Sequence, residues 1–258
     1  MKVVLFCGGL GTRLREHSET IPKPLVSIGY RPIIWHLMRY YASYGHNDFV
    51  LCLGYRGDAI REYFLNYREA MSADFTLSDG GRKIELHGRD INDWRITFVD
   101  TGLHSNIGER LVAVREYLRN EETFLANYSD GLGDVDLGAL IDDFNRHRVT
   151  ASFAAVRPSS TFHRVSLSSD NYVTDMASVE DSDFLINAGY FVLRQEIFDH
   201  IEPGEELVEA PFKRLIDARK LRAYRHTGFW RAMDTLKDKI AFDRMYAAGD
   251  RPWERAPE

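Results

Sequence analysis

The sequence predicts an α/β protein with a Rossmann-like, mostly parallel mixed sheet flanked by helices. Three observations support this prediction. Apolar runs of strand length alternate with segments of helical period, a glycine cluster directly follows the first run, and no repeat or Pro/Ser-rich linker interrupts the 258 residues. Alternating strands and helices form βαβ units, in which the strands run parallel.

The first half of the chain contains four predicted strands, at 2–7, 48–53, 95–99 and 123–128, each rich in β-branched, aromatic or other apolar residues. Apolar residues at helical spacing lie between them, as expected of helices that cover a sheet. These residues are Ile33, Ile34, Leu37, Met38 and Tyr41, then Ile60, Tyr63, Phe64 and Tyr67, then Leu111, Val114 and Leu118. A further helix is predicted over 136–147.

We expect one continuous domain over 1–258 with three additions to this pattern. The polar, glycine-containing segment 72–94 is predicted to be an inserted hairpin or loop, and loops of this length are often lids or interface elements. Short apolar runs within 149–227 predict edge strands and a lid. Residues 235–258 are predicted to form a C-terminal helix and a tail.

The composition excludes several classes of protein. The 39 Asp and Glu residues outnumber the 33 Lys and Arg residues, and a net charge of −6 argues against general binding to nucleic acid. There is no run of 18 apolar residues and no signal-peptide pattern, so we expect no membrane contact and a cytoplasmic protein. Cys7 and Cys52 lie in apolar runs and are predicted to be buried, without a disulfide or zinc.

The glycine cluster is the strongest functional signal. Gly8, Gly9 and Gly11 follow the first strand, and glycine backbones approach a ligand closely enough for their N–H groups to converge on phosphate oxygens. The segment is not a Walker A loop, and Leu14 replaces the last glycine of GxGxxG, which disfavours a dinucleotide dehydrogenase. The structural alternative is a tight turn without a ligand.

Two cations accompany the loop. Arg13 ends the segment Gly-Gly-Leu-Gly-Thr-Arg, and Lys23 stands between Pro22 and Pro24, whose fixed φ angles restrict the backbone around it. Together the two side chains could neutralise a triphosphate. The loop, Arg13 and the Pro-Lys-Pro segment therefore predict a phosphate-binding site rather than a turn alone.

The sequence resembles the sugar-1-phosphate nucleotidylyltransferases, and most closely the glucose-1-phosphate cytidylyltransferases among them. Besides GGLGTRL and PKP, the resemblance rests on the order of further segments along nearly the whole chain. They are PIIWHLMRYY (32–41), GYRGDAIREYF (54–64), FVDTG (98–102), GERL (108–111), SDG (129–131), INAGYFVL (186–193) and GFWRAMDT (228–235).

The resemblance implies the fold of nucleotide-diphospho-sugar transferases and assigns a nucleotide-binding set. These residues are Phe6, Gly8, Gly9, Gly11, Thr12, Arg13, Lys23 and Arg110. Arg13, Lys23 and Asp130 are implied to be catalytic. For Arg110, an exposed position on a helix is the alternative.

Two carboxylates are candidates for holding Mg²⁺, a hard cation that takes a few carboxylates, phosphate oxygens and water. Asp130 follows a predicted strand at the sheet edge where ligands bind, and Asp234 precedes a helical stretch. The resemblance assigns the metal to both. Structural alternatives are a turn for Asp130 and a helix N-cap for Asp234.

On the acceptor side, within 149–227, the sequence departs from the family. Relatives carry a Glu-Lys-Pro whose lysine contacts the sugar phosphate, whereas residues 174–181 contain no lysine. We predict acceptor contacts from Asn187, which matches the family's asparagine, and from His163 and Arg164, which could replace the lost cation. A solvated strand edge for His163 and Arg164 and a buried structural role for Asn187 are the alternatives, and a different acceptor or a loss of activity would also explain the departure.

The predicted reaction is transfer of CMP from CTP to a sugar 1-phosphate with release of pyrophosphate, with Mg²⁺ as cofactor. An ionised phosphate attacks without a general base, because its second pKa is roughly 6. The alternatives are another nucleotide, a non-hexose phosphorylated acceptor, or a nucleotide-binding subunit without turnover. The relatives imply a homo-oligomer.

Overall fold

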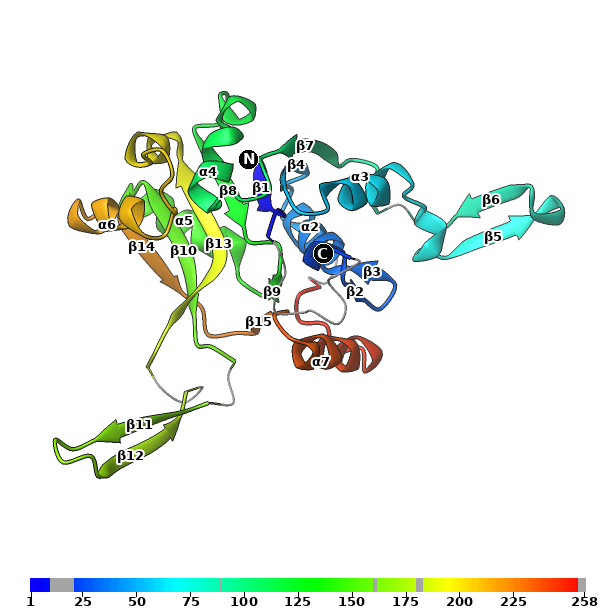
Figure 1. The fold of residues 1–258 in the computed structure, drawn as a ribbon. Coiled ribbons are helices and arrows are strands. Elements are labelled where there is room, and N and C mark those ends of the chain that lie inside the picture. Colours follow the sequence, from blue (N-terminus) through cyan, green and yellow to red (C-terminus); the bar gives the residue numbers. More distant parts are fainter. Residues whose placement is uncertain (10–20, 89, 160–161, 180–182, 255–258) are drawn as a thin grey trace.

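The computed structural model describes residues 1–9, 21–88, 90–159, 162–179 and 183–254. Within them, one sheet has the strand order β14-β10-β13-β8-β1-β4-β7 (Figure 1). β13 is antiparallel to both of its neighbours, β8 and β10, and the other adjacent strands are parallel. This confirms the mostly parallel mixed sheet. The strands are β1 (Val3–Phe6), β4 (Asp48–Leu53), β7 (Arg95–Asp100), β8 (Thr123–Asn127), β10 (Ala151–Val156), β13 (Ile186–Arg194) and β14 (Leu221–Arg225).

Helices cover both faces of this sheet, and alternate residues of each strand enter two separate cores. One core contains residues of α2 (Ile33–Ser43), α3 (Gly57–Leu65), α5 (Leu137–His147) and α7 (Leu236–Ala247). The other contains residues of α4 (Ile107–Ala113) and α6 (Ala210–Asp217). The predicted amphipathic helices therefore bury their apolar faces against the sheet.

Side chains that accept backbone hydrogen bonds fix the first turns of three helices. Asn106 and Thr235 each form a capping box, with Glu109 and Asp238 respectively, and Asp136 accepts from Ala139. The helix expected through Leu118 is shorter than its periodicity indicates. α4 ends at Ala113, and the 3₁₀ turn η5 (Arg115–Leu118) continues the apolar face.

Two hairpins project from the body on different sides (Figure 1). β5 (Phe75–Ser78) and β6 (Lys83–Leu86) form the hairpin predicted within 72–94. β11 (His163–Leu167) and β12 (Val173–Ser178) form the second. Two smaller pairings are β2 (Ser27–Ile28) with β3 (Arg31–Pro32) and β9 (Gly131–Gly133) with β15 (Trp230–Ala232). The remaining 3₁₀ turns are η2 (Lys23–Leu25), η3 (Glu69–Met71), η4 (Asp79–Gly81) and η6 (Gln195–His200).

The segment 149–227 departs from expectation because it completes the main sheet. It supplies β10, β13 and β14, and only β14 lies at an edge. Its runs are continuous and apolar because β10 and β13 are covered on both faces. Cys7 and Cys52 are buried, as predicted, and both are free thiols. In the described ranges, no helix has the length and apolar character that a membrane crossing requires.

Candidate active site

The glycine segment begins where β1 ends. Cys7 donates its backbone N–H to the carbonyl of Cys52 at 2.9 Å, which keeps β1 and β4 paired beyond Phe6. Gly8 is buried and Gly9 is exposed. Among the described residues, no atom lies within 4 Å of the position that a Cβ on Gly9 would take.

The rest of the predicted loop, with Gly11, Thr12 and Arg13, lies outside the described residues. Phe6 is buried, with its ring centroid 6.3 Å from that of Tyr128. The contacts of these residues with a nucleotide stay predictions.

Lys23 is held by a rigid backbone. Pro22 has φ −64° and ψ 145°, Pro24 is buried, and the carbonyl of Lys23 accepts the N–H of Val26 at 3.1 Å. The side chain is only 14% exposed, and its ammonium donates to Oδ2 of Asp130 at 2.7 Å and Oδ1 of Asp234 at 2.6 Å. The structure thus brings together the three residues predicted to hold phosphate and metal.

The turn after β8 aims Asp130 at this point. Ser129 has φ +64° and donates its hydroxyl to the carbonyl of Phe6 at 2.7 Å, while its N–H donates to Oδ1 of Asn127. The turn is therefore tied to the end of β1. Asp130 itself faces Lys23, so its side chain does more than shape the turn.

The small pairing of β9 with β15 brings Asp234 beside Asp130. Ala232 is opposite Gly131, and Met233 donates its N–H to the carbonyl of Asp130 at 2.8 Å. The N-cap of α7 is Thr235, whose side chain accepts from Asp238. The alternative that Asp234 caps the helix is therefore wrong, and its carboxylate is available to Lys23.

The three charges influence one another strongly because they are partly buried. Burial raises the pKa of Asp130, the nearby Asp234 adds to this, and Lys23 opposes it. Burial alone would lower the pKa of Lys23, but the two carboxylates outweigh it and raise that pKa. Lys23 is therefore an ammonium at neutral pH.

The donor set fits Mg²⁺. One carboxylate oxygen from each aspartate contacts the same nitrogen atom, so the two oxygens are close enough to share a cation. In the described part of the chain, no cluster of three or more His, Cys, Asp or Glu side chains could hold a metal ion. Mg²⁺ often uses one or two carboxylates and takes its other ligands from phosphates and water.

Arg110 lies beneath the glycine segment. It is 3% exposed, and its guanidinium donates to the carbonyl of Gly8 at 3.0 Å, the carbonyl of Leu53 at 3.1 Å and the hydroxyl of Thr101 at 2.7 Å. A Cβ on Gly8 would lie 2.0 Å from Nη1, so any other residue there would displace the guanidinium. The alternative of an exposed arginine is wrong. The predicted nucleotide contact of Arg110 stays untested, and the contacts seen are with the ends of strands.

Asn187 is bonded at the start of β13. Its amide donates to the hydroxyl of Tyr128 at 3.1 Å and accepts from the N–H of Gly189 at 2.8 Å. Trp230 donates its indole N–H to the carbonyl of Ala188 at 3.0 Å. Tyr128 and Trp230 were not predicted as site residues, although both belong to or adjoin the segments SDG and GFWRAMDT that carry the resemblance.

His163 and Arg164 lie apart from this group. Both belong to β11, in a hairpin that projects from the main sheet (Figure 1). Arg164 pairs with Asp175 at 2.6 Å, and the two side chains are 57% and 49% exposed. The structure does not bring them together with Asn187, and their exposure fits the solvated-strand alternative. An acceptor contact from either residue stays a prediction. The position of these residues in the sequence does not indicate that they belong to a hairpin separate from the main sheet.

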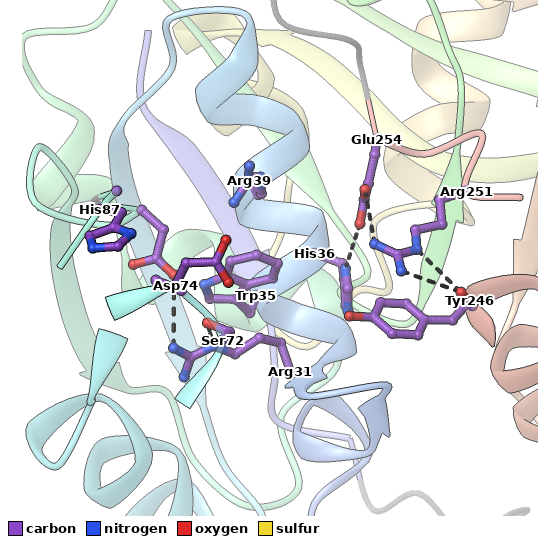
Figure 2. A pocket seen from close by; sticks show the side chains of 13 residues that line it. Arg31, Trp35, His36, Arg39, Ser72, Asp74, His87, Tyr246, Arg251 and Glu254 are labelled. Carbon is purple, nitrogen blue, oxygen red and sulfur yellow. Dashed lines mark hydrogen bonds and ion pairs between the residues drawn. The ribbon is translucent and has the colours of Figure 1, made fainter. Parts of the chain in front are cut away.

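A cleft of about 380 Å³ lies between α2, the base of the β5–β6 hairpin and the C-terminal segment (Figure 2). Arg31 donates there to the hydroxyl of Ser72 at 2.7 Å and the carbonyl of Arg68 at 2.9 Å. Arg251 packs 3.7 Å from the centroid of the Tyr246 ring. Arg31 thus connects the base of the β5–β6 hairpin to the main domain, and Arg251 connects the C-terminal segment to α7.

His36 is buried in the wall of this cleft. Its Nε2 is 3.0 Å from the carbonyl of Ile28. Burial lowers the pKa of His36 to about 4, so the ring is neutral at pH 7.

Comparison with known proteins adds an independent observation. The family model described as "Nucleotidyl transferase" matches residues 2–232. The chain belongs to the nucleotidyl transferase family. This nucleotidyl transferase is 38% identical over 255 residues to the glucose-1-phosphate cytidylyltransferases of Salmonella typhi and Salmonella typhimurium, with 98% of this chain and 99% of each relative covered.

Solved structures support the fold of the nucleotidyl transferase. The UTP-bound UGPase from Acinetobacter baumannii has a TM-score of 0.70 at 18% identity, covering 96% of this chain and 93% of that one. The structure titled UDP-glucose pyrophosphorylase complexed with UDP-glucose has a TM-score of 0.68 at 17% identity, covering 96% and 98%. The sheet is thus shared with sugar nucleotidyltransferases.

Proposed function

We propose that this nucleotidyl transferase transfers CMP from CTP to a sugar 1-phosphate and releases pyrophosphate, acting in the cytoplasm as a homo-oligomer. The observation that carries the proposal is the convergence of Lys23, Asp130 and Asp234 beside the end of β1. The full-length identity to two cytidylyltransferases supports the choice of nucleotide and acceptor. Glucose 1-phosphate is the first acceptor to test.

The residues divide the work of an in-line displacement. The acceptor's phosphate oxygen attacks the α-phosphorus of the nucleotide, a new P–O bond forms, and the bond to the β-phosphate breaks so that pyrophosphate leaves. Asp130 and Asp234 would hold Mg²⁺, which neutralises charge on the transferring and leaving phosphates. Lys23 supplies a second positive charge, and the amides after β1, with Arg13, are expected to bind phosphate oxygens.

No protein nucleophile is needed. A phosphomonoester with a second pKa of roughly 6 is largely ionised at neutral pH, so its oxygen is already an effective nucleophile. Catalysis then rests on positioning and charge stabilisation. The cluster of one ammonium and two carboxylates suits this role.

The decisive test measures pyrophosphate release over a grid of four nucleoside triphosphates and a panel of phosphorylated acceptors with Mg²⁺. Release with CTP and a sugar 1-phosphate is expected. Release with another pair would redirect the proposal to a different nucleotide or a non-hexose acceptor. CTP binding without release on any acceptor would instead indicate a nucleotide-binding subunit without turnover.

Asn187 is the acceptor residue whose removal should matter most. Asn187→Ala is expected to raise KM for the sugar 1-phosphate about tenfold, as the loss of about one hydrogen bond would, and to leave KM for CTP unchanged. Arg164→Ala serves as the control and should change neither KM by more than about twofold, because exposed ion pairs contribute little. Steady-state kinetics with each substrate varied in turn would check this. An unchanged acceptor KM in Asn187→Ala would remove Asn187 from the site.

The exposed apolar faces of the two hairpins support the proposal of a homo-oligomer. In β5–β6, Phe75 lies opposite Leu86 and Leu77 opposite Ile84, so one face is apolar, and Leu77 is 57% exposed. In β11–β12, Val165 lies opposite Met176, and both are exposed. Isolated two-stranded hairpins are marginally stable in water. A second copy of the chain is the occupant we propose for these faces.

Leu77→Asp should therefore dissociate the oligomer. The matched control is Thr76→Asp, which places the same charge on the opposite face of the same strand. Light scattering after size-exclusion chromatography is expected to show a smaller mass for Leu77→Asp alone. Equal masses for both variants and the parent would count against this interface.

A further inference from the structure

The ammonium of Lys23 lies where a divalent cation would bind. It contacts one oxygen of Asp130 and one of Asp234, and among the described residues it makes no other hydrogen bond. A Mg²⁺ ion on these oxygens would sit roughly 2.1 Å from each. Two cations cannot occupy the space between the same pair of oxygens, so Lys23 and the metal exclude each other there.

We propose that the ammonium of Lys23 occupies the metal position until a nucleotide binds. Without nucleotide, its ammonium neutralises the two carboxylates and opposes binding of the free divalent cation. A nucleoside triphosphate relieves this opposition, because its phosphates accept the ammonium and supply further oxygens to the metal. The inference rests on the proposed function, since it takes Asp130 and Asp234 as the metal ligands.

The exchange requires movement of one side chain only. Pro22 and Pro24 restrict the backbone, and the N–H of Leu25 donates to the carbonyl of Pro22 at 2.8 Å. The lysine side chain, by contrast, rotates about four bonds and carries a point charge that needs no fixed geometry. Lys23 can thus turn from the carboxylates to a phosphate while its backbone stays in place.

The small number of protein ligands favours entry of metal with nucleotide. Two carboxylates supply too few oxygens for the six ligands of Mg²⁺, and the described residues contain no third acidic or histidine ligand grouped with them. Phosphate oxygens, together with water, would complete the coordination. The ammonium keeps the carboxylate pair neutralised until the phosphates arrive.

The test measures binding of Mn²⁺, a spectroscopic substitute for Mg²⁺, from the electron paramagnetic resonance signal of the free ion. Without nucleotide, Lys23→Met is expected to bind Mn²⁺ at least about tenfold more tightly than the parent protein, equivalent to about 1.4 kcal/mol. The control is Lys239→Met, which removes an ammonium paired with Asp243 on α7 and should leave Mn²⁺ binding unchanged. Circular dichroism confirms that each variant is folded.

Two further measurements ensure that the conclusion does not depend on the single variant Lys23→Met. Adding a non-hydrolysable CTP analogue should strengthen Mn²⁺ binding much more in the parent protein than in Lys23→Met. The double variant Lys23→Met/Asp130→Asn should lose the gain in affinity.

Equal Mn²⁺ affinity in Lys23→Met and the parent, or a gain that persists without Asp130, would overturn the inference. The proposed function would survive such a result, because the pyrophosphate grid tests it on the unmodified protein.

Discussion

Asp130→Asn is expected to lower kcat by at least about a thousandfold, the upper part of the range for removing one charge-stabilising group. Asparagine keeps the size of the side chain and is itself a common turn residue, so the turn after β8 should form as before. The substitution removes the carboxylate charge that lies 2.7 Å from the ammonium of Lys23 and that we propose as a ligand of Mg²⁺. A large fall in kcat would therefore show that Asp130 acts as a metal ligand and not only as a turn residue.

The same substitution should leave the fold intact. Burial raises the pKa of Asp130, which means that the site disfavours the charged form and tolerates a neutral amide. Asp134→Asn, four positions further along and paired with His226 at 2.9 Å, is the matched control and should retain turnover. The measurements are steady-state pyrophosphate release and the urea midpoint of unfolding. Full activity of Asp130→Asn would exclude the residue from the site.

The sequence was sufficient to predict the alternating strands and helices of the first half of the chain and the three charged residues, Lys23, Asp130 and Asp234, that meet. Lys23 is fixed by its prolines, and Asp130 by its position at a strand end, both of which are local features. Asp234 comes next to Asp130 because β9 pairs with β15, a contact between distant segments. The expectation of a nucleotidyltransferase, drawn from these residues and their neighbours, is confirmed by the family model.

Other features depend on three-dimensional placement that local patterns do not encode. The run containing His163 and Arg164 alternates like a sheet strand, yet within the described residues it pairs only with β12, in a hairpin that projects from the body (Figure 1). A two-stranded ribbon and an edge strand share the same alternation, so the pattern does not distinguish them. Arg110 likewise looks like a helical surface residue, and only the packing of α4 against β1 and β4 reveals that it is buried.

Arg110→Ala is expected to destabilise the nucleotide-free protein by about 3 kcal/mol or more. The guanidinium donates to the carbonyls of Gly8 and Leu53 and to the hydroxyl of Thr101, at the ends of three adjacent strands. Truncation would remove these three buried hydrogen bonds and open a cavity, although the carbonyl of Leu53 keeps the N–H and hydroxyl of Thr101 and that of Gly8 keeps the N–H of Tyr55. Hydrogen bonds to a charged group contribute about 1.5–3 kcal/mol each. Urea unfolding without any ligand measures the effect.

This experiment separates two roles for Arg110. If the guanidinium acts only on a bound nucleotide, stability without nucleotide should not change, and CTP affinity alone should fall. If it holds the strand ends, as its contacts indicate, Gly8→Ala should reproduce the instability, because the added Cβ would lie 2.0 Å from Nη1. Arg119→Ala, at a side chain that is 69% exposed, is the control and should shift stability by less than about 1 kcal/mol. Arg110 would then affect nucleotide binding indirectly, by fixing the backbone of Gly8, from which the segment that we propose to bind phosphate begins.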